Sequence, residues 1–213
     1  MNAEQLASLV RLPFAMVCIG KRASGKSVLI DQLVEAMVNQ NKVYSIVLLS
    51  STAHLNDDFP SLPASCKLPF SNDILQQIMD TQEKTDREKR KHLIVILDDV
   101  LSLREAKNSA EINSLYTRGR HFLCHPVILS QANSHVISPQ IRANTDYWIV
   151  GKTIKPVYEA IWTQIAGIDK KPFIDLCERL TVDHQFIGID VRKNSTVLSD
   201  WIWVIKAKIN KQK

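Results

Sequence analysis

Short apolar segments alternate with amphipathic ones along most of this chain. The apolar runs cover residues 14–19, 43–50, 93–97, 126–130 and 147–150, with the length and makeup of strands buried on both faces. Between them, apolar side chains recur every three or four residues, which predicts helices that each bury one face. The pattern therefore predicts an α/β fold with a mostly parallel central sheet flanked by helices.

Capping residues and prolines set the ends of the predicted helices. Four helices are predicted by range: residues 1–12, residues 28–39, residues 156–166 closed by Gly167, and residues 172–180. Three more are predicted by their first residues: one begins at Ser71 or Asn72, one at Asn108 with Glu111, and one at Ser138 and Pro139. The helix that begins at Asn108 is predicted to end at Gly119. Residues 51–70, with three prolines, are predicted to be a loop. Residues 186–191 and 201–205 are predicted to form a terminal strand pair, joined by a polar turn at residues 193–195.

Composition adds little to this picture but excludes several classes of protein. The chain has 213 residues, 45% hydrophobic and 23% charged, which predicts a single domain over residues 1–213. No apolar run is long enough to cross a bilayer, and residues 1–11 do not resemble a signal peptide. Four scattered cysteines favour a reducing, intracellular location. A net charge of +5 permits a polyanionic partner without requiring one.

Residues 20–27 carry the strongest chemical signal in the chain. They fit G-x-x-x-x-G-K-[ST], and they stand between a predicted strand and a predicted helix. The alternative is a chance match, which the flanking elements make a poor explanation. The motif predicts that ATP is held by Gly20, Lys21, Arg22, Ala23, Ser24, Gly25, Lys26, Ser27 and Val28. Lys26 would reach the β- and γ-phosphates, and the Ser27 hydroxyl would bind Mg²⁺.

Polar residues at two other strand ends complete a candidate hydrolytic site. Asp98 follows an apolar run and is predicted to hold Mg²⁺, and Asp99 is placed to orient or deprotonate the attacking water. The alternative is that the two acids only end a strand. Gln131 ends another strand, where an amide can contact both the γ-phosphate and the water, unless it merely faces solvent.

Two basic segments are open to a structural and a functional interpretation. Arg118 and Arg120 either neutralise a helix dipole or supply an arginine finger to a neighbouring subunit. Residues 84–92 are either a solvated helix end or a loop that grips DNA phosphates. His121, Cys124 and His125 lack a fourth ligand and are not predicted to bind a metal.

In motif order and spacing, residues 12–150 resemble the poxvirus-type genome-packaging ATPases of the FtsK–HerA superfamily. The resemblance rests on the residue 20–27 loop, on Asp98 with Asp99, and on residues 116–121 leading to Gln131. It implies a RecA-like core in which the Gln131 strand lies between the other two site strands. It also implies a homo-oligomeric ring around double-stranded DNA. By position Asp99 matches the family's water-activating acid, although the superfamily more often has Glu there. Gln131 matches the family's sensor residue, and Arg118 or Arg120 matches its arginine finger.

These expectations predict an ATPase that translocates viral double-stranded DNA, independent of its sequence, into a preformed capsid. The expected partners are a second copy of the chain and a capsid vertex or membrane protein, and the expected location is the virion or host cytoplasm. A cellular HerA-like or conjugative DNA pump is an alternative with the same chemistry. A small-molecule P-loop kinase and a non-catalytic, nucleotide-gated assembly factor are alternatives from other classes. The chain after residue 150 has no motif that assigns it a role.

Overall fold

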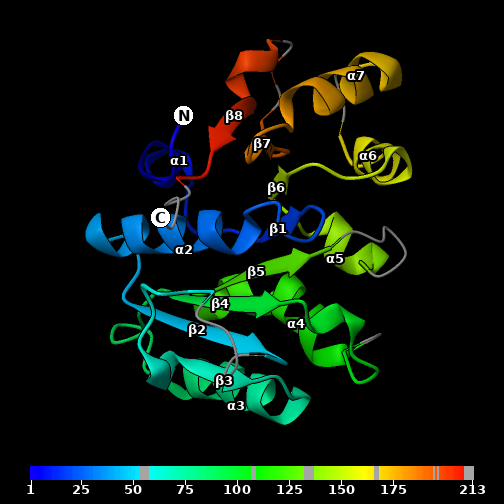
Figure 1. The fold of residues 1–213 in the computed structure, drawn as a ribbon. Coiled ribbons are helices and arrows are strands. Elements are labelled where there is room, and N and C mark those ends of the chain that lie inside the picture. Colours follow the sequence, from blue (N-terminus) through cyan, green and yellow to red (C-terminus); the bar gives the residue numbers. More distant parts are fainter. Residues whose placement is uncertain are drawn as a thin grey trace.

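One sheet of eight strands forms the middle of the computed structural model, in the order β3-β2-β4-β5-β1-β6-β7-β8 (Figure 1). The structure describes residues 1–52, 58–106, 109–131, 137–165, 168–193, 195 and 197–208. The strands are β1 (Met16–Ile19), β2 (Ser45–Ser50), β3 (Lys67–Pro69), β4 (Leu93–Asp98), β5 (Cys124–Ser130), β6 (Tyr147–Val150), β7 (Gln185–Asp190) and β8 (Ile202–Lys206).

The first six strands are parallel, and β7 and β8 continue the sheet in antiparallel pairing. This confirms the predicted α/β class, the mostly parallel sheet and the C-terminal strand pair. The neighbours of β1 are β5 and β6, and β5 separates β1 from β4, as the resemblance implied. The carboxyl ends of β1, β4 and β5 therefore meet at one edge of the sheet, where ligands of open α/β sheets bind.

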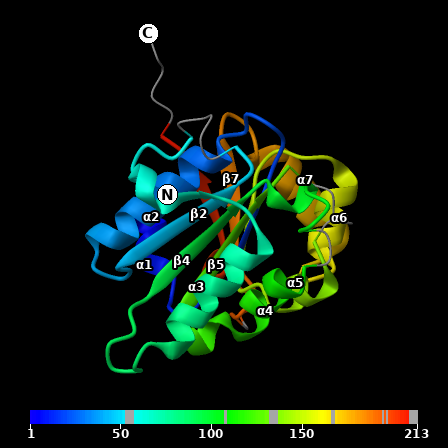
Figure 2. The ribbon, with the colours of Figure 1, turned by 90° about the horizontal axis from the view of Figure 1, so that it is seen from below.

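Helices cover both faces of the sheet (Figure 2). They are α1 (Ala3–Leu9), α2 (Lys26–Asn39), α3 (Asn72–Lys84), α4 (Ala110–Arg118), α5 (Pro139–Ala143), α6 (Lys155–Trp162) and α7 (Lys170–Leu180). One buried cluster packs α1 and α2 on one face of the sheet, against side chains such as Met16 and Ile96. A second cluster packs helices α3, α4, α5, α6 and α7 on the opposite face, against side chains such as Val17 and Leu97. Alternate residues of each strand thus serve two cores, which explains the unbroken apolar runs.

Side-chain caps fix most of the predicted helix starts. The hydroxyl of Ser71 accepts from the Ile74 N–H, and that of Ser138 accepts from the Ile141 N–H. Helix α4 is capped by Ser109, the residue after the predicted Asn108, and it ends at Gly119 as predicted. Asn108, Gly167 and Asn194, named as caps or turn residues from the sequence, lie outside the described residues.

The structure differs from the sequence prediction at one helix end and one loop. Helix α6 ends at Trp162 instead of at residue 166. The predicted loop at residues 51–70 contains β3, which pairs with β2 at the edge of the sheet and ends at Pro69. A three-residue edge strand leaves too short an apolar pattern to detect, and proline is tolerated at such an edge.

In the basic segment at residues 84–92, the guanidinium of Arg90 donates to the carbonyls of Glu83 and Thr85 and to that of His121. Arg90 therefore fixes the conformation of the loop between α3 and β4.

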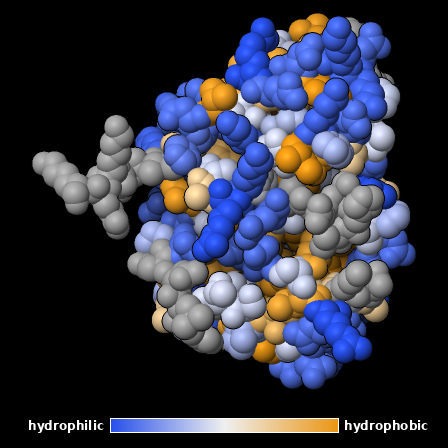
Figure 3. Space-filling model, turned by 45° about the vertical axis from the view of Figure 1, so that its right-hand side comes forward, coloured by the Kyte–Doolittle hydropathy of each residue, from blue (hydrophilic) through white to orange (hydrophobic). Residues whose placement is uncertain are grey.

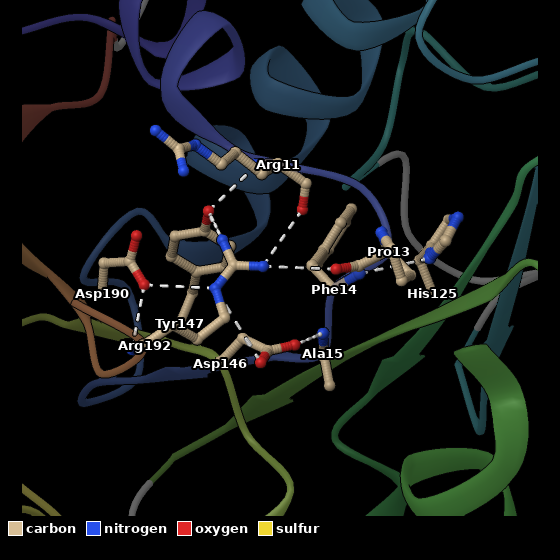
Figure 4. A network of polar contacts seen from close by, with 9 residues as sticks. All are labelled: Arg11, Pro13, Phe14, Ala15, His125, Asp146, Tyr147, Asp190 and Arg192. Atoms are coloured by element: carbon tan, nitrogen blue, oxygen red, sulfur yellow. Dashed lines mark hydrogen bonds and ion pairs between the residues drawn. The ribbon is translucent and has the colours of Figure 1, made fainter.

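A partly exposed polar network ties the C-terminal strands to the start of the chain (Figure 4). Arg192 lies 3.3 Å from the Asp190 carboxylate and 3.9 Å from that of Asp146. Its other N–H groups donate to the Tyr147 hydroxyl and to two carbonyls of the segment before β1. Asp146 in turn accepts from the N–H of Ala15, at 2.8 Å. The network therefore fixes β6 and β7 against the entry to β1.

None of the helices in the described part of the chain is long and apolar enough to span a membrane. The assignment of residues 1–213 to one domain stays a prediction.

His125 is a fully buried histidine at the amino end of β5. Its Nδ1 accepts from the Phe14 N–H at 3.4 Å, and its Nε2 lies 2.7 Å from Nδ1 of His92. Burial, reinforced by His92, lowers the pKa of His125 to about 3. The ring is therefore neutral in the folded protein across the physiological range.

We expect this histidine to make the fold sensitive to acid. In the unfolded chain His125 takes up a proton near pH 6.5, whereas in the folded chain it does so only near pH 3. Its contribution to stability is complete above about pH 6.5 and falls by about 1.4 kcal/mol per pH unit below it. Between pH 6.5 and 4.5 the free energy of unfolding of His125→Gln, which keeps an acceptor for Phe14, should decline less steeply than that of the wild type.

Urea titrations over this pH range measure that slope. His121→Gln is the matched control because His121 is exposed, and it should keep the wild-type slope. Equal slopes for His125→Gln and the wild type would contradict the assignment of a buried neutral ring.

Candidate active site

The carboxyl ends of the parallel strands frame an open pocket of about 730 Å³. It is lined by residues 22–28, by Thr52, Asp58, Asp98, Asp99, Leu129 and Gln131, which end or follow β2, β4 and β5, and by His184. Figure 3 shows this side of the molecule, where hydrophilic side chains dominate the upper part and hydrophobic ones gather lower down. Every residue predicted from the sequence to contact nucleotide lines this pocket except Gly20 and Lys21.

The loop between β1 and α2 depends on glycine at two positions. Gly25 has φ 91° and precedes the first residue of α2, a left-handed conformation that glycine adopts without strain. A Cβ on Gly20 would stand 2.8 Å from Oγ of Ser24, so a side chain there would force the Ser24 hydroxyl to move. The loop is held on both sides, because the Gly20 N–H donates to the Ser130 carbonyl and the Lys21 N–H to the Lys152 carbonyl.

Lys26 is the buried cation of the pocket, with 8% of its surface exposed. Its Nζ donates to the carbonyls of Gly20 at 2.9 Å and Lys21 at 3.0 Å. These two residues therefore hold the lysine side chain although they do not line the pocket. Burial lowers the pKa of Lys26, and the nearby Cys18, Asp98 and Asp99 oppose that shift. A buried ammonium beside the N-terminus of α2 creates a binding site for an anion.

The predicted acids and the predicted amide meet on the other side of the pocket. Burial, with repulsion from Asp58 and Asp99, raises the pKa of Asp98 to about 6, and Lys26 partly offsets this. Asp99 has φ 52° and donates its N–H to the carbonyl of Leu129 in β5. Nε2 of Gln131 donates to Oδ2 of Asp99 at 2.9 Å. A carboxylate fixed by an amide in this way can accept a hydrogen bond from a water through its other oxygen.

Three polar residues of the lining, Thr52, Asp58 and His184, are not predicted from the sequence. Thr52 and Asp58 lie in the segment of residues 51–70, which the sequence predicts to be a loop. That segment is fixed to α2 because Ser61 donates through its hydroxyl to Oδ1 of Asp31, at 2.5 Å. His184 comes from the C-terminal third of the chain, where no motif marked it. For Asp58 the pair of acids at residues 57 and 58 is a detectable signal, whereas no sequence pattern marks His184.

Arg118 and Arg120 do not enter this pocket. They lie at the amino end of β5, at the edge of the sheet opposite Gln131, and both are exposed. The Arg118 guanidinium is 3.8 Å from Oε1 of Glu83 and 5.4 Å from the centre of the Phe122 ring. Their distance from the pocket of their own subunit leaves the finger in a neighbouring subunit as a prediction.

Among the described residues, no three His, Cys, Asp or Glu side chains form a group that could hold a metal ion alone. Protein side chains of this pocket would therefore share a cation with oxygen atoms from a ligand or water, as Mg²⁺ sites on phosphates do.

Residues 2–161 match the sequence profile of the family described as Poxvirus A32 protein. Uncharacterized protein 015R of Frog virus 3 (isolate Goorha) is 25% identical over an alignment of 205 residues, and the match covers 92% of this chain and 62% of that protein. The chain thus spans less than two thirds of the length of that curated relative.

Several solved structures share the fold. The genome packaging NTPase B204 of Sulfolobus turreted icosahedral virus 2, in complex with ATP-gammaS, has a TM-score of 0.65 and 16% identity, covering 92% of this chain and 98% of that one. The monomer form of the pCW3 conjugation coupling protein TcpA with ATPgS has a TM-score of 0.61 and 14% identity, covering 88% and 62%. The cytoplasmic domain of the Thermomonospora curvata Type VII secretion ATPase EccC has a TM-score of 0.60 and 15% identity, covering 91% of this chain and 25% of that one.

The electrostatics of Asp98 generate a prediction about stability. Its pKa is about 3.9 in an unfolded chain and about 6 here, so its charge costs stability above pH 6 and nothing below about pH 3.9. Asp98→Asn should raise the free energy of unfolding of the ligand-free protein by about 3 kcal/mol at pH 8, and by much less at pH 4.5.

Urea unfolding at the two pH values measures this difference. Asp86→Asn, at an exposed acid far from the pocket, should change stability little at either pH. A destabilised Asp98→Asn protein at pH 8 would show that this carboxylate is not penalised by the pocket.

Proposed function

The chain belongs to the poxvirus A32 protein family, and we propose that it is an ATPase that drives viral double-stranded DNA into a preformed capsid. The observation that carries this proposal is the convergence of Lys26, Asp98, Asp99 and Gln131 on one pocket beside the glycine loop. Lys26 at the start of α2 and three residues at the ends of β4 and β5 would supply the phosphate-binding, metal-binding and water-positioning groups that hydrolysis of a nucleoside triphosphate requires.

The loop supplies the binding of the triphosphate. Its backbone N–H groups and the N-terminus of α2 offer partial positive charge, and Lys26 adds a full one. Nζ of Lys26 is already directed into the loop by the carbonyls of Gly20 and Lys21. Exchange of one of these contacts for a phosphate oxygen would bind the β- and γ-phosphates without moving the backbone.

Ser27 and Asp98 fit a Mg²⁺ ion because both line the pocket and both offer the oxygen ligands that this ion prefers. When bound, Mg²⁺ neutralises charge on the transferring phosphate. A nearby cation would also lower the raised pKa of Asp98, so ligand binding would relieve the repulsion among Asp58, Asp98 and Asp99.

Asp99 and Gln131 provide the groups for water attack. The Gln131 amide donates to Oδ2 of Asp99, which leaves the other carboxylate oxygen of Asp99 to accept from a water. The left-handed backbone at Asp99 and the hydrogen bond from its N–H to the Leu129 carbonyl fix the position of the main chain that carries this carboxylate. We therefore assign Asp99 as the water-activating group and Gln131 as the residue that positions both Asp99 and the γ-phosphate.

The proposed partners follow from the family and from similar proteins. B204 is a genome packaging NTPase, and TcpA is a conjugation coupling protein. By analogy we propose that this chain acts on double-stranded DNA through its phosphates, as a homo-oligomeric ring docked on a capsid vertex or membrane protein. Capsid filling would place it in the virion or in the host cytoplasm. A conjugative or HerA-like pump would share the same ATPase site.

Phosphate release in the presence and absence of double-stranded DNA tests the function. We expect DNA to stimulate wild-type release. Lys26→Ala should abolish release and weaken ATP binding, because the phosphate charge loses its partner, and Asp99→Asn should bind ATP normally but release almost no phosphate. Asp86→Asn should behave as wild type. Hydrolysis by Asp99→Asn at the wild-type rate would refute the assignment of the activating acid, and phosphate transfer to a small molecule would indicate a kinase.

A second experiment tests the ring. Arg118 and Arg120 point away from their own pocket, so one of them should act on a neighbour's. The corresponding Ala variant should bind ATP normally yet hydrolyse it about a thousandfold more slowly. Mixing it with Asp99→Asn should restore part of the activity, because some interfaces then combine an intact acid with an intact arginine.

Arg179→Ala is the matched control for these arginine variants, since Arg179 is exposed near the end of α7 and belongs to no candidate site. Steady-state phosphate release from the mixtures, over a range of protein concentrations, gives the answer. The ring mechanism fails if neither arginine variant slows hydrolysis, or if turnover per subunit stays constant down to concentrations at which only monomers exist.

A further inference from the structure

The turn of residues 182–184, just before β7, lies at the same sheet edge as the phosphate loop but on its other side. Strand order places β5 and β4, with the acids and Gln131, on one side of β1, and β6 and β7 on the other (Figure 1). Strand β7 is antiparallel to β6, so it begins where β1 and β6 end. The C-terminal third of the chain therefore reaches the pocket from the side opposite the hydrolytic groups.

Two strained residues hold this turn in a defined shape. Asp183 has φ 49° and His184 has φ 57°, values that cost about 1 kcal/mol or more for a residue with a Cβ. The shape is held by the Gln185 N–H on the Val182 carbonyl and by the Ala207 N–H on the His184 carbonyl. Lys206 of β8 adds an ion pair with the Asp183 carboxylate, at 2.8 Å. Strain maintained by so many contacts is typical of ligand clamps.

The result is a histidine fixed against the phosphate loop. Nδ1 of His184 lies 3.2 Å from the carbonyl oxygen of Ser24, 160 positions away in the chain. A carbonyl only accepts, so Nδ1 is the donor in this contact. The ring lines the pocket beside Arg22 and Ser24, and it is exposed to the pocket's solvent.

The hydrolytic groups determine which end of the nucleotide would lie beside this ring. The γ-phosphate must point toward Asp99 and Gln131, which hold the attacking water, so the nucleoside leaves the loop in the opposite direction. That direction leads to β6, β7 and His184. We propose that His184 forms a wall of the nucleoside subsite, with its imidazole against the adenosine of ATP, and is a determinant of nucleotide affinity. This inference rests on the proposed ATPase function of the pocket.

Binding of two probes separates a contact with the nucleoside from an effect on the loop. Calorimetry would measure the affinity of the full chain for ATPγS and for inorganic tripolyphosphate, which has no nucleoside. His184→Ala should weaken ATPγS binding about tenfold, in the range that loss of one aromatic–base contact produces, and leave tripolyphosphate binding unchanged. His184→Phe keeps an aromatic face but not the Ser24 bond and should retain most of the ATPγS affinity.

Further variants guard against a trivial explanation. His184→Gln keeps a donor for Ser24 but has no ring, so it should behave like His184→Ala. His121→Ala, an exposed histidine at the opposite edge, should bind both probes as wild type. Equal losses for both probes would overturn the proposal and leave His184 as a support of the loop, and no loss for either probe would overturn it too. If the folded wild type bound neither probe, the ATPase proposal itself would fail.

Discussion

The anchoring of the phosphate loop between two parallel neighbours is the constraint on which the rest of the structure depends. Gly20 bonds to the end of β5 and Lys21 to the segment after β6, so the loop is fixed from both sides. Only a strand in the middle of the sheet offers two such neighbours, which requires the chain to pass from β4 through β5 before β6 closes the other side. The crossover order is therefore the condition for a rigid anion site.

The same edge concentrates charges that the ligand-free protein cannot fully satisfy. A buried Lys26 and three acids share one pocket, and burial shifts the pKa values of both Lys26 and Asp98 against their charged forms. Such an arrangement leaves unfavourable electrostatic energy in the ligand-free pocket. Functional pockets are often less stable than the cores that support them, and here the two cores on either face of the sheet provide that support.

The antiparallel C-terminal strands give the region without motifs a physical role. Arg192 joins β7 to Asp146 and to the segment that enters β1, so the added strands stabilise the strand that carries the phosphate loop. The strand pair also places the turn before β7 beside that loop. A segment that has no recognisable nucleotide motif thus extends the sheet and contributes a side chain to the pocket.

The sequence by itself determined the features that depend on neighbours in the chain. The loop at residues 20–27, the apolar strands, the caps at Ser71 and Ser138 and the acids after β4 each follow from a local pattern of residue types. Only the tertiary structure decided the edge strand β3, the loop-holding role of Arg90 and the presence of Asp58 and His184 in the pocket. These depend on contacts between segments far apart in the chain, and such contacts leave no periodic signal in the residues that make them.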